Sequence, residues 1–361
     1  MLMPIFTIQI FKSDQMKLKN IFPFLFLMLY LTGKSQKLPS EYVNTFIGTG
    51  GHGHTYPGAT VPFGMVQLSP DTRLEGWDGC GGYHYDDSYI YGFSHTHLNG
   101  TGVPDLCDIL IMPGTGDDIW NNGSNGKLGY GSNFSHEDES AAPGYYRVLL
   151  KDNHILAELS ATTRAGMHRY TFPKSQNAKI LFDLFHRDEV LESSLKIVSN
   201  VRIEGMRRSR SWANDQYIYF VAEFSKPFTS HQIAINDMAK IGASFAKNEK
   251  NIKAIFHFVT SPKEQILVKV GISAVSIEGA GLNLKKEIPG WDFEKVVNDA
   301  KIIWNQELSK ISVEGGSEEK KTVFYSALYH TMVNPNTFTD VDGRYRGRDL
   351  NPSCKLVNTT Y

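Results

Sequence analysis

The sequence predicts a mainly β fold, in which a two-layer antiparallel β-sandwich is followed by linker helices. Short alternating or apolar runs rich in Val, Ile, Tyr and Phe recur through the middle of the chain, and Gly, Asn, Asp and Pro separate them. No clear helical pattern lies between these runs, which disfavours a parallel sheet with crossover helices. After Pro289 the apolar residues recur at steps of three and four, which is typical of helices.

Each expected strand combines this composition with turn residues near its ends. The expected strands are 145–150, 154–159, 167–172, 179–185, 195–203, 217–224, 252–260 and 265–275. Their close spacing favours antiparallel sheets that pack face to face.

Two helices are expected towards the end of the chain. The first begins after Asp292, a suitable N-cap, and ends before Gly315 and Gly316. Its expected apolar face consists of Phe293, Val296, Val297, Ala300, Ile303, Trp304 and Leu308. The second begins after Ser317 with an acidic first turn, as the helix dipole favours, and ends before Pro335. Its expected apolar face consists of Val323, Phe324, Ala327, Leu328 and Met332.

Length and charge limit the possible domain organisation and the possible binding partners. The 361 residues carry a formal net charge of -1, and this length allows one large β-domain or two smaller domains. The chain has no basic stripe, so no nucleic-acid partner is expected. We predict a β-sandwich domain over 37–288, a helical linker over 289–335 and the start of a further domain over 336–361.

The N-terminal residues 1–36 are interpreted as a secretory signal peptide. Lys17 and Lys19 precede an apolar run over 21–31, which has the length of a signal-peptide core and is short for a membrane span. Cleavage is expected between Thr32 and Lys37, leaving no stable membrane span, with an uncleaved anchor as the alternative. Residues 1–15 precede a second possible start codon at Met16, and we interpret them as a segment that is not part of the translated protein.

Three cysteines, Cys80, Cys107 and Cys354, are too few for a disulfide framework. A single Cys80–Cys107 bridge is one option, and the odd count indicates at least one free thiol. The default role of each is a small buried hydrophobic residue.

The run from Tyr42 to Gly102 is the most informative part of the sequence. It is rich in Gly, aromatic residues and His, a composition that suits neither a helix nor a solvated linker. Polar-tipped rings beside glycines can stack on the C–H faces of a sugar and hydrogen-bond its hydroxyls. We therefore expect rigid loops that line a carbohydrate site.

This run resembles the N-terminal signature of the bacterial exo-acting α-mannosidases of glycoside hydrolase family 92. The matching segments are VNTFIGT at 43–49, PGA at 57–59, PFGM at 62–65, GYHY at 82–85, GFSHTHL at 92–98 and GTG at 100–102. The segments NPNTF at 334–338 and DVDGRYRG at 340–347 resemble the start of the family's (α/α)6 barrel domain. Residues 336–361 are accordingly expected to begin a truncated catalytic barrel.

The resemblance implies removal of terminal α-linked mannose from glycans, with α-1,2 linkages expected, by a calcium-dependent inverting mechanism. It also implies secretion to the periplasm or cell surface of a bacterium. In the family the barrel supplies the general acid, the general base and most calcium ligands, and these have no counterpart in this sequence. We therefore assign no catalytic residue and no metal ligand, and expect a fragment that is inactive alone. The alternatives are a non-catalytic module that binds carbohydrate or a partner, and a structural β-protein.

The candidate substrate-binding residues come from the same loops. They are Trp77, Gly76, Gly81, Gly82, His95, His97 and His54. The resemblance implies that the Trp77 loop stacks on the sugar beyond the cleaved bond, whereas a Trp among glycines can also plug a sandwich edge. The glycines would allow close approach of the backbone to hydroxyls.

The two histidines His95 and His97 also have a spacing that can hold a metal, with His84 and Asp105 as further ligands. Hydroxyl recognition or a structural hydrogen bond is the favoured interpretation of this pair. The segment with Asp340, Asp342, Arg344 and Arg346 is interpreted as an ion network at a domain boundary, with a sugar clamp as the alternative.

Overall fold

The structure is a computed structural model that describes residues 37–356. The described residues from Pro39 onwards belong to one compact unit. The predicted signal peptide lies outside the described residues. Within the described residues, no helix is long and apolar enough to cross a membrane.

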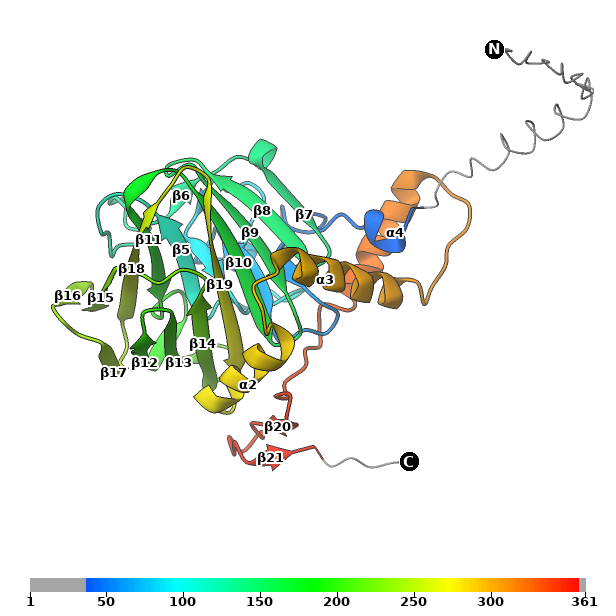
Figure 1. The fold of residues 1–361 in the computed structure, drawn as a ribbon. Helices are drawn as coiled ribbons and strands as arrows, with labels where there is room; N and C mark the ends of the chain where they lie inside the picture. Colours follow the sequence, from blue (N-terminus) through cyan, green and yellow to red (C-terminus); the bar gives the residue numbers. More distant parts are fainter. Residues whose placement is uncertain (1–36, 357–361) are drawn as a thin grey trace, which may run out of the picture. The chain divides into compact units, whose positions relative to one another are not determined.

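Two antiparallel sheets form the body of this unit (Figure 1). The eight-stranded sheet has the order β1 (Ala59–Thr60), β2 (Gln67–Asp71), β4 (Gly92–Ser94), β5 (Leu110–Gly114), β11 (Ser175–Asp183), β18 (Ile252–Thr260), β15 (Ser230–Ile235) and β16 (Met238–Lys240). The nine-stranded sheet has the order β17 (Phe245–Glu249), β12 (Glu189–Ser199), β13 (Arg202–Arg210), β14 (Gln216–Phe224), β19 (Glu264–Ser273), β10 (Ala165–Phe172), β9 (Ile155–Ala161), β8 (Tyr145–Leu150) and β7 (Glu139–Ala142). Two short ribbons pair β3 (Tyr89–Ile90) with β6 (Ser132–Asn133), and β20 (Arg344–Tyr345) with β21 (Cys354–Lys355).

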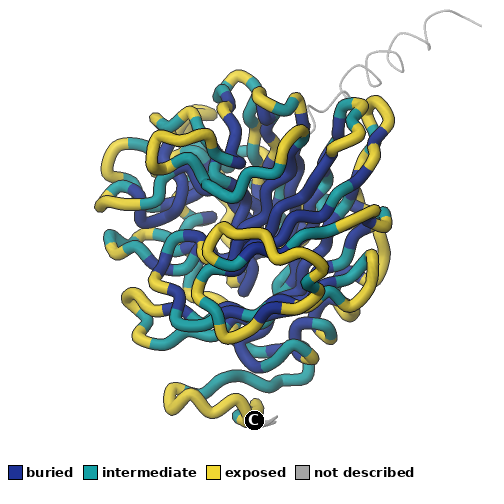
Figure 2. Tube along the Cα trace, turned by 90° about the vertical axis from the view of Figure 1, so that its left-hand side faces the viewer, coloured by how far each residue is buried: buried dark blue, intermediate teal, exposed yellow. Residues whose placement is uncertain are grey.

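The main hydrophobic core lies between the two sheets. Phe182 of β11 contacts Phe220 and Phe224 of β14, with ring centroids 6.3 and 5.9 Å apart. Phe224 also lies 5.2 Å from Phe256 of β18. Figure 2 shows that buried residues follow the strands, whereas the loops that join them are largely exposed. These cross-sheet contacts confirm the predicted β-sandwich.

Most expected strands are present, and two coincide with β8 and β18 residue for residue. The expected strand 195–203 is wrong, because the chain turns at Asn200 and Val201 between β12 and β13. Apolar residues continue on both sides of this tight hairpin turn and conceal it in the sequence.

One helix, α2 (Ile277–Glu287), is absent from the sequence prediction. Ser276 caps it, because its side chain accepts a hydrogen bond from the amide of Gly279. The helix lies against β19 and β14, and a Cβ on Gly271 of β19 would fall 2.4 Å from the carbonyl oxygen of Ala280. The helix's own glycines, Gly279 and Gly281, weaken its helical signal in the sequence. A Cβ on Gly279 would fall 2.7 Å from Ser273 Oγ of β19, so this glycine also permits close packing of helix on sheet.

The predicted helices correspond to α3 (Phe293–Leu308) and α4 (Glu318–His330), and the side chains of Asp292 and Ser317 cap them as expected. Trp304 of α3 is fully buried and donates a hydrogen bond from Nε1 to the carbonyl of Thr60 at 2.7 Å. Its ring lies 4.4 Å from that of Tyr329 on α4. Trp304 therefore joins both helices to the sandwich.

The face that α4 buries differs from the predicted one. Val323 is 59% exposed, whereas Tyr325, Ser326 and Tyr329 are buried. The hydroxyl of Ser326 accepts a hydrogen bond from the amide of Asn44 at 2.9 Å, so this polar side chain has a partner inside the protein. On α3, Ile303 is likewise 40% exposed rather than buried.

The segment after α4 is attached to the sandwich through Asp340. This carboxylate accepts hydrogen bonds from Ser273 at 2.7 Å and from Asn283 at 2.8 Å. Asp342 instead pairs with Arg344 at 2.7 Å. The predicted ion network is therefore confined to Asp342 and Arg344, and neutral donors hold Asp340.

Replacing Trp304 tests the role of this side chain. Trp304→Ala should lower the free energy of unfolding by about 3–5 kcal/mol, because it leaves a large cavity and frees the Thr60 carbonyl. The control is Ile302→Ala on the same helix, whose side chain is 54% exposed and which should change stability by about 0.5 kcal/mol or less. Urea unfolding of both variants gives the comparison, and equal losses would contradict the assigned role.

Candidate functional site

An exposed tryptophan marks the candidate site. Trp77 begins a short 3-10 turn, η3 (Trp77–Gly79), and is 62% exposed. One side of its ring packs edge-on against His54, with centroids 4.9 Å apart. Gly102 lies beneath the ring, since an added Cβ there would fall 2.3 Å from Trp77 Cη2. The ring is thus held by two neighbours and open to solvent, as a stacking platform requires.

The adjacent loop brings polar groups to this platform. Nδ1 of His52 lies 2.9 Å from Oδ1 of Asp78, and Nε2 of His54 lies 3.9 Å from the same oxygen. The hydrogen bond from His52 lowers the pKa of Asp78, which keeps this carboxylate ionised at neutral pH. Sugar hydroxyls that approached Trp77 would meet imidazole donors and a carboxylate acceptor.

A second exposed tryptophan, Trp212, lies between β13 and β14 and is also 62% exposed. Its loop is attached to the 100–106 loop, since Ser211 Oγ donates to the Pro104 carbonyl at 2.7 Å and the Ala213 amide to Asp105 at 2.7 Å. Sequence reasoning missed this residue. A Trp in a polar hairpin turn is the sequence feature that could have identified it. The turn is about 100 residues away along the chain from the 100–106 loop that it contacts, so the sequence alone does not connect the two.

A buried polar cluster lies beneath the Trp77 turn. Arg187 donates one hydrogen bond to the carbonyl of Gly79 and another, at 2.9 Å, to the sulfur of Cys107. Nε2 of His97 lies 3.0 Å from Asp71 Oδ1, and both side chains are fully buried. Cys107 and Cys80 are both free thiols, so the bridge considered from the sequence does not form.

The predicted sugar contacts of His95 and His97 are wrong, because both side chains have no exposed surface. His95 Nδ1 donates to the Ile109 carbonyl at 2.7 Å, so its Nε2 is an acceptor for Nε2–H of His168 at 3.1 Å. Nδ1 of His168 in turn accepts from the Tyr170 hydroxyl at 2.8 Å. This chain of hydrogen bonds fails when both imidazoles are protonated, because the two Nε2 atoms would then each carry a hydrogen. Burial accordingly lowers the pKa of His95 to about 4 and that of His168 well below its ordinary value.

The predicted roles of Gly81 and Gly82 also need correction. Both glycines are buried, Gly81 against the backbone of Thr55 and Gly82 against the carboxylate of Asp71. A Cβ on Gly82 would lie 2.3 Å from that carboxylate, and its φ of +79° is unfavourable for other residues. These glycines allow the loops to pack on the buried cluster rather than on a sugar. Gly76, in contrast, is exposed beside Trp77.

The metal set considered from the sequence does not assemble. His84 Nε2 contacts the carbonyl of Gly51 at 3.0 Å, and Asp105 accepts hydrogen bonds from backbone amides at 2.8 and 2.7 Å. Of the predicted site residues, the structure therefore exposes Trp77 and Gly76, with the largely buried His54 packed against the Trp77 ring.

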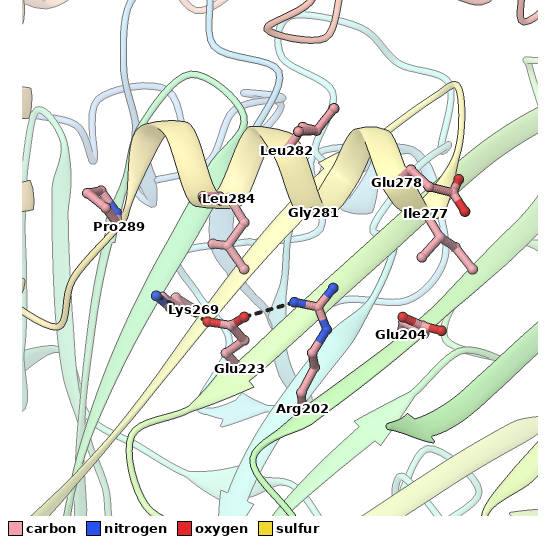
Figure 3. A pocket seen from close by; sticks show the side chains of 11 residues that line it. Arg202, Glu204, Glu223, Lys269, Ile277, Glu278, Gly281, Leu282, Leu284 and Pro289 are labelled. Atoms are coloured by element: carbon pink, nitrogen blue, oxygen red, sulfur yellow. Dashed lines mark hydrogen bonds and ion pairs between the residues drawn. The ribbon is translucent and has the colours of Figure 1, made fainter. Parts of the chain in front are cut away.

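A separate pocket of about 560 Å³ lies between α2 and the outer face of β13, β14 and β19 (Figure 3). Its carboxylate Glu223 pairs with Arg202 at 3.0 Å and with Lys269 at 3.2 Å, and Glu204 pairs with Lys196 at 3.3 Å. Arg202, Glu223 and Lys269 of this pocket thus neutralise one another, and Glu204 pairs with Lys196 outside the pocket lining. The Trp77 surface is the stronger candidate because its ring and polar groups are open to a ligand.

The neutral histidine chain predicts acid sensitivity. The pKa of His168 is lower in the folded chain than the value of about 6.5 expected in the unfolded chain. Below pH 6.5 the unfolded chain therefore binds a proton that the folded chain does not, and the free energy of unfolding falls as the pH falls. We expect His168→Gln to flatten the fall of unfolding free energy between pH 6.5 and 5 by up to about 1.4 kcal/mol per pH unit. Urea unfolding across this range measures the slope. A variant slope equal to that of the wild type would contradict neutral His168.

Comparisons with known proteins agree with this architecture. Residues 42–273 match the model described as the glycosyl hydrolase family 92 N-terminal domain, and residues 279–360 match that of the family 92 catalytic domain. The boundary between the matches falls between β19 and α2.

Relatives of known structure include a family 92 α-mannosidase from Bacteroides thetaiotaomicron, 37% identical with a TM-score of 0.84, for which the match covers 88% of this chain and 44% of that chain. A family 92 inverting mannosidase from the same species is 27% identical, with a TM-score of 0.75 and coverage of 88% and 42%.

A curated relative from Arthroderma benhamiae, described as an uncharacterized secreted glycosidase, is 29% identical over 86% of this chain and 43% of its own length. The chain thus spans less than half the length of these relatives. Its sandwich, its helices and the matches to both domain models show that the chain belongs to glycoside hydrolase family 92.

Proposed function

We propose that this chain contributes to a secreted α-mannosidase that removes terminal α-linked mannose, preferentially from α-1,2 linkages. The support is membership of family 92 and the similarity to structures described as family 92 mannosidases. The observation that carries the proposal within this chain is the Trp77 platform, which is exposed and held from two sides.

In this proposal Trp77 binds the sugar on the leaving-group side of the scissile bond. The indole face stacks on the C–H face of the sugar ring, while His54, His52 and Asp78 hydrogen-bond its hydroxyls. Because Gly102 and His54 fix the ring, little conformational entropy is lost when the sugar binds. The surface would therefore orient the substrate rather than cleave it.

Inversion requires one carboxylic acid at the leaving oxygen and one carboxylate that activates water, about 6.5–9.5 Å apart. We assign neither role to a described residue. The catalytic-domain model matches only 279–360, and the relatives are more than twice as long as the matched region, so we propose that the acid and base come from the remainder of that domain. The 361-residue chain would then be inactive alone.

We also propose that the whole enzyme requires calcium, with ligands mainly outside these residues. The acidic segment at 340–342 does not fit a calcium ion, because neutral donors occupy Asp340 and Arg344 pairs with Asp342.

Loss of the platform should weaken glycan binding. Trp77→Ala should raise the dissociation constant of the chain for α-1,2-mannobiose roughly tenfold or more, since a buried ring face contributes about 1.5 kcal/mol or more. The matched control is Trp291→Ala, which removes a tryptophan 39% exposed in the α2–α3 connection. Calorimetric titration gives both constants, and equal effects would argue against the Trp77 site.

An assay of mannose release distinguishes the α-mannosidase proposal from the alternative of a carbohydrate-binding module. We expect no release from α-1,2-mannobiose by the 361-residue chain. We expect release, abolished by a calcium chelator, by a protein in which the remainder of a family 92 catalytic domain follows residue 360. Chelator-sensitive release by the short chain would contradict the placement of acid and base. Binding without release in both proteins would favour the alternative, a carbohydrate-binding module.

A further inference from the structure

Four side chains with metal-binding atoms converge in the buried cluster beneath the Trp77 turn. Asp71 ends β2, His97 follows β4, Cys107 precedes β5 and His186 follows β11. Three of them have no exposed surface, and His186 is 3% exposed. Each charged group buried inside the sandwich loses its hydration, so its charge must be balanced by an ion pair, by hydrogen bonds or by a bound metal ion.

The distances suit a common metal ion. One ligand atom each from Asp71, His97 and Cys107 lie within 4.8 Å of one another. His97 Nε2 lies 3.0 Å from Asp71 Oδ1, and His186 Nε2 lies 3.1 Å from Asp71 Oδ2. Ligands of tetrahedral zinc, with bonds of about 2.0–2.3 Å, lie roughly 3.3–3.7 Å from one another. The separations among Asp71, His97 and Cys107 would therefore contract by up to about 1 Å around one ion, and His186 would join them through its contact with Asp71.

Hydrogen bonding orients the first histidine as a ligand. His97 Nδ1 donates to the carbonyl of Gln67 at 2.7 Å, so Nε2 points at Asp71 Oδ1, and a metal ion bound there would displace the hydrogen that Nε2 donates to this carboxylate. Ligating histidines in proteins characteristically donate their other ring N–H to a carbonyl or carboxylate in this way. The Ser94 hydroxyl lies 3.2 Å from the same Nε2 and would rotate away when the metal bound.

Unpartnered atoms provide a second, independent observation. Nδ1 of His186 is buried without a hydrogen-bond partner, whereas His186 Nε2 and Asp71 Oδ2 face each other at 3.1 Å without the geometry of a hydrogen bond. Buried polar atoms rarely lack partners, so these positions indicate a missing ligand. His186 thereby supplies the fourth donor of a tetrahedral set.

We propose that Asp71, His97, Cys107 and His186 bind a zinc ion in a closed, structural site. Thiolate and imidazole donors suit zinc and exclude calcium, which takes oxygen ligands. Four protein ligands leave no open position for a substrate or water, and their burial agrees with a structural role.

The position of Arg187 suggests what the ion would stabilise. Its guanidinium donates to Cys107 Sγ and also to the carbonyl of Gly79 in the Trp77 turn. An N–H···S contact is compatible with a metal-bound thiolate. The zinc site would therefore fix Cys107, through it Arg187, and through Arg187 the turn that carries Trp77.

Metal analysis of the whole 361-residue chain tests the proposal. After purification without a metal-affinity tag and dialysis against zinc, we expect one zinc ion per folded chain. Replacement by cobalt should give the intense visible bands of tetrahedral cobalt and a thiolate-to-cobalt charge-transfer band. Cys107→Ser should lose the charge-transfer band and stoichiometric zinc. The matched control Cys80→Ser, which changes an equally buried cysteine nearby, should keep both.

A measurement of metal binding by the wild-type chain is by itself sufficient to overturn the proposal. A folded wild-type chain that binds neither zinc nor cobalt stoichiometrically would show that the cluster is an ion-pair network only. Should Cys107→Ser fail to fold, His186→Asn provides the second variant, and it should weaken zinc binding at least tenfold by competition with a chelator. An unchanged affinity would remove His186 from the site, and a charge-transfer band that survives in folded Cys107→Ser would remove Cys107.

Discussion

The arrangement of the candidate site depends on the two hydrogen bonds of Arg187. One reaches the backbone of the Trp77 turn at Gly79, and the other reaches Cys107 inside the sandwich. A guanidinium can make such a connection because its donors lie in a fixed plane and it stays charged. The exposed ring is thus connected to the core through a polar side chain, and the glycines around it remove the Cβ atoms that would prevent this close packing.

Helices α3 and α4 also contact the loops of the run that carries Trp77. Trp304 donates to the Thr60 carbonyl, and His330 at the end of α4 contacts the carbonyl of Ile47 at 3.1 Å. The run from Tyr42 to Gly102 therefore contacts both α3 and α4. Loops with so many polar backbone groups can be rigid only when neighbouring elements satisfy those groups.

Sequence patterns predicted the sandwich and two of the three described α-helices because these depend on local periodicity and capping residues such as Asp292 and Ser317. The α2 helix was missed because its glycines, which serve packing on β19, weaken the helical signal. The signature loops pointed to Trp77, but sequence could not tell that His97 and Gly82 face inward. Asp71, which contacts both, lies on β2, and His168, which contacts the neighbouring His95, lies on β10, so only the folded chain brings these groups together.

The central claim is that the Trp77 surface, rather than the pocket beneath α2, binds a mannoside. Its most direct test is nuclear magnetic resonance of the tryptophan indole N–H groups during titration with α-1,2-mannobiose. The chain has five tryptophans, each with one such signal. The proposed site predicts a saturable shift of the Trp77 signal, with that of Trp291, beside the α2 pocket, unchanged. A shift of Trp291 without Trp77, or no shift at saturating sugar, would contradict it.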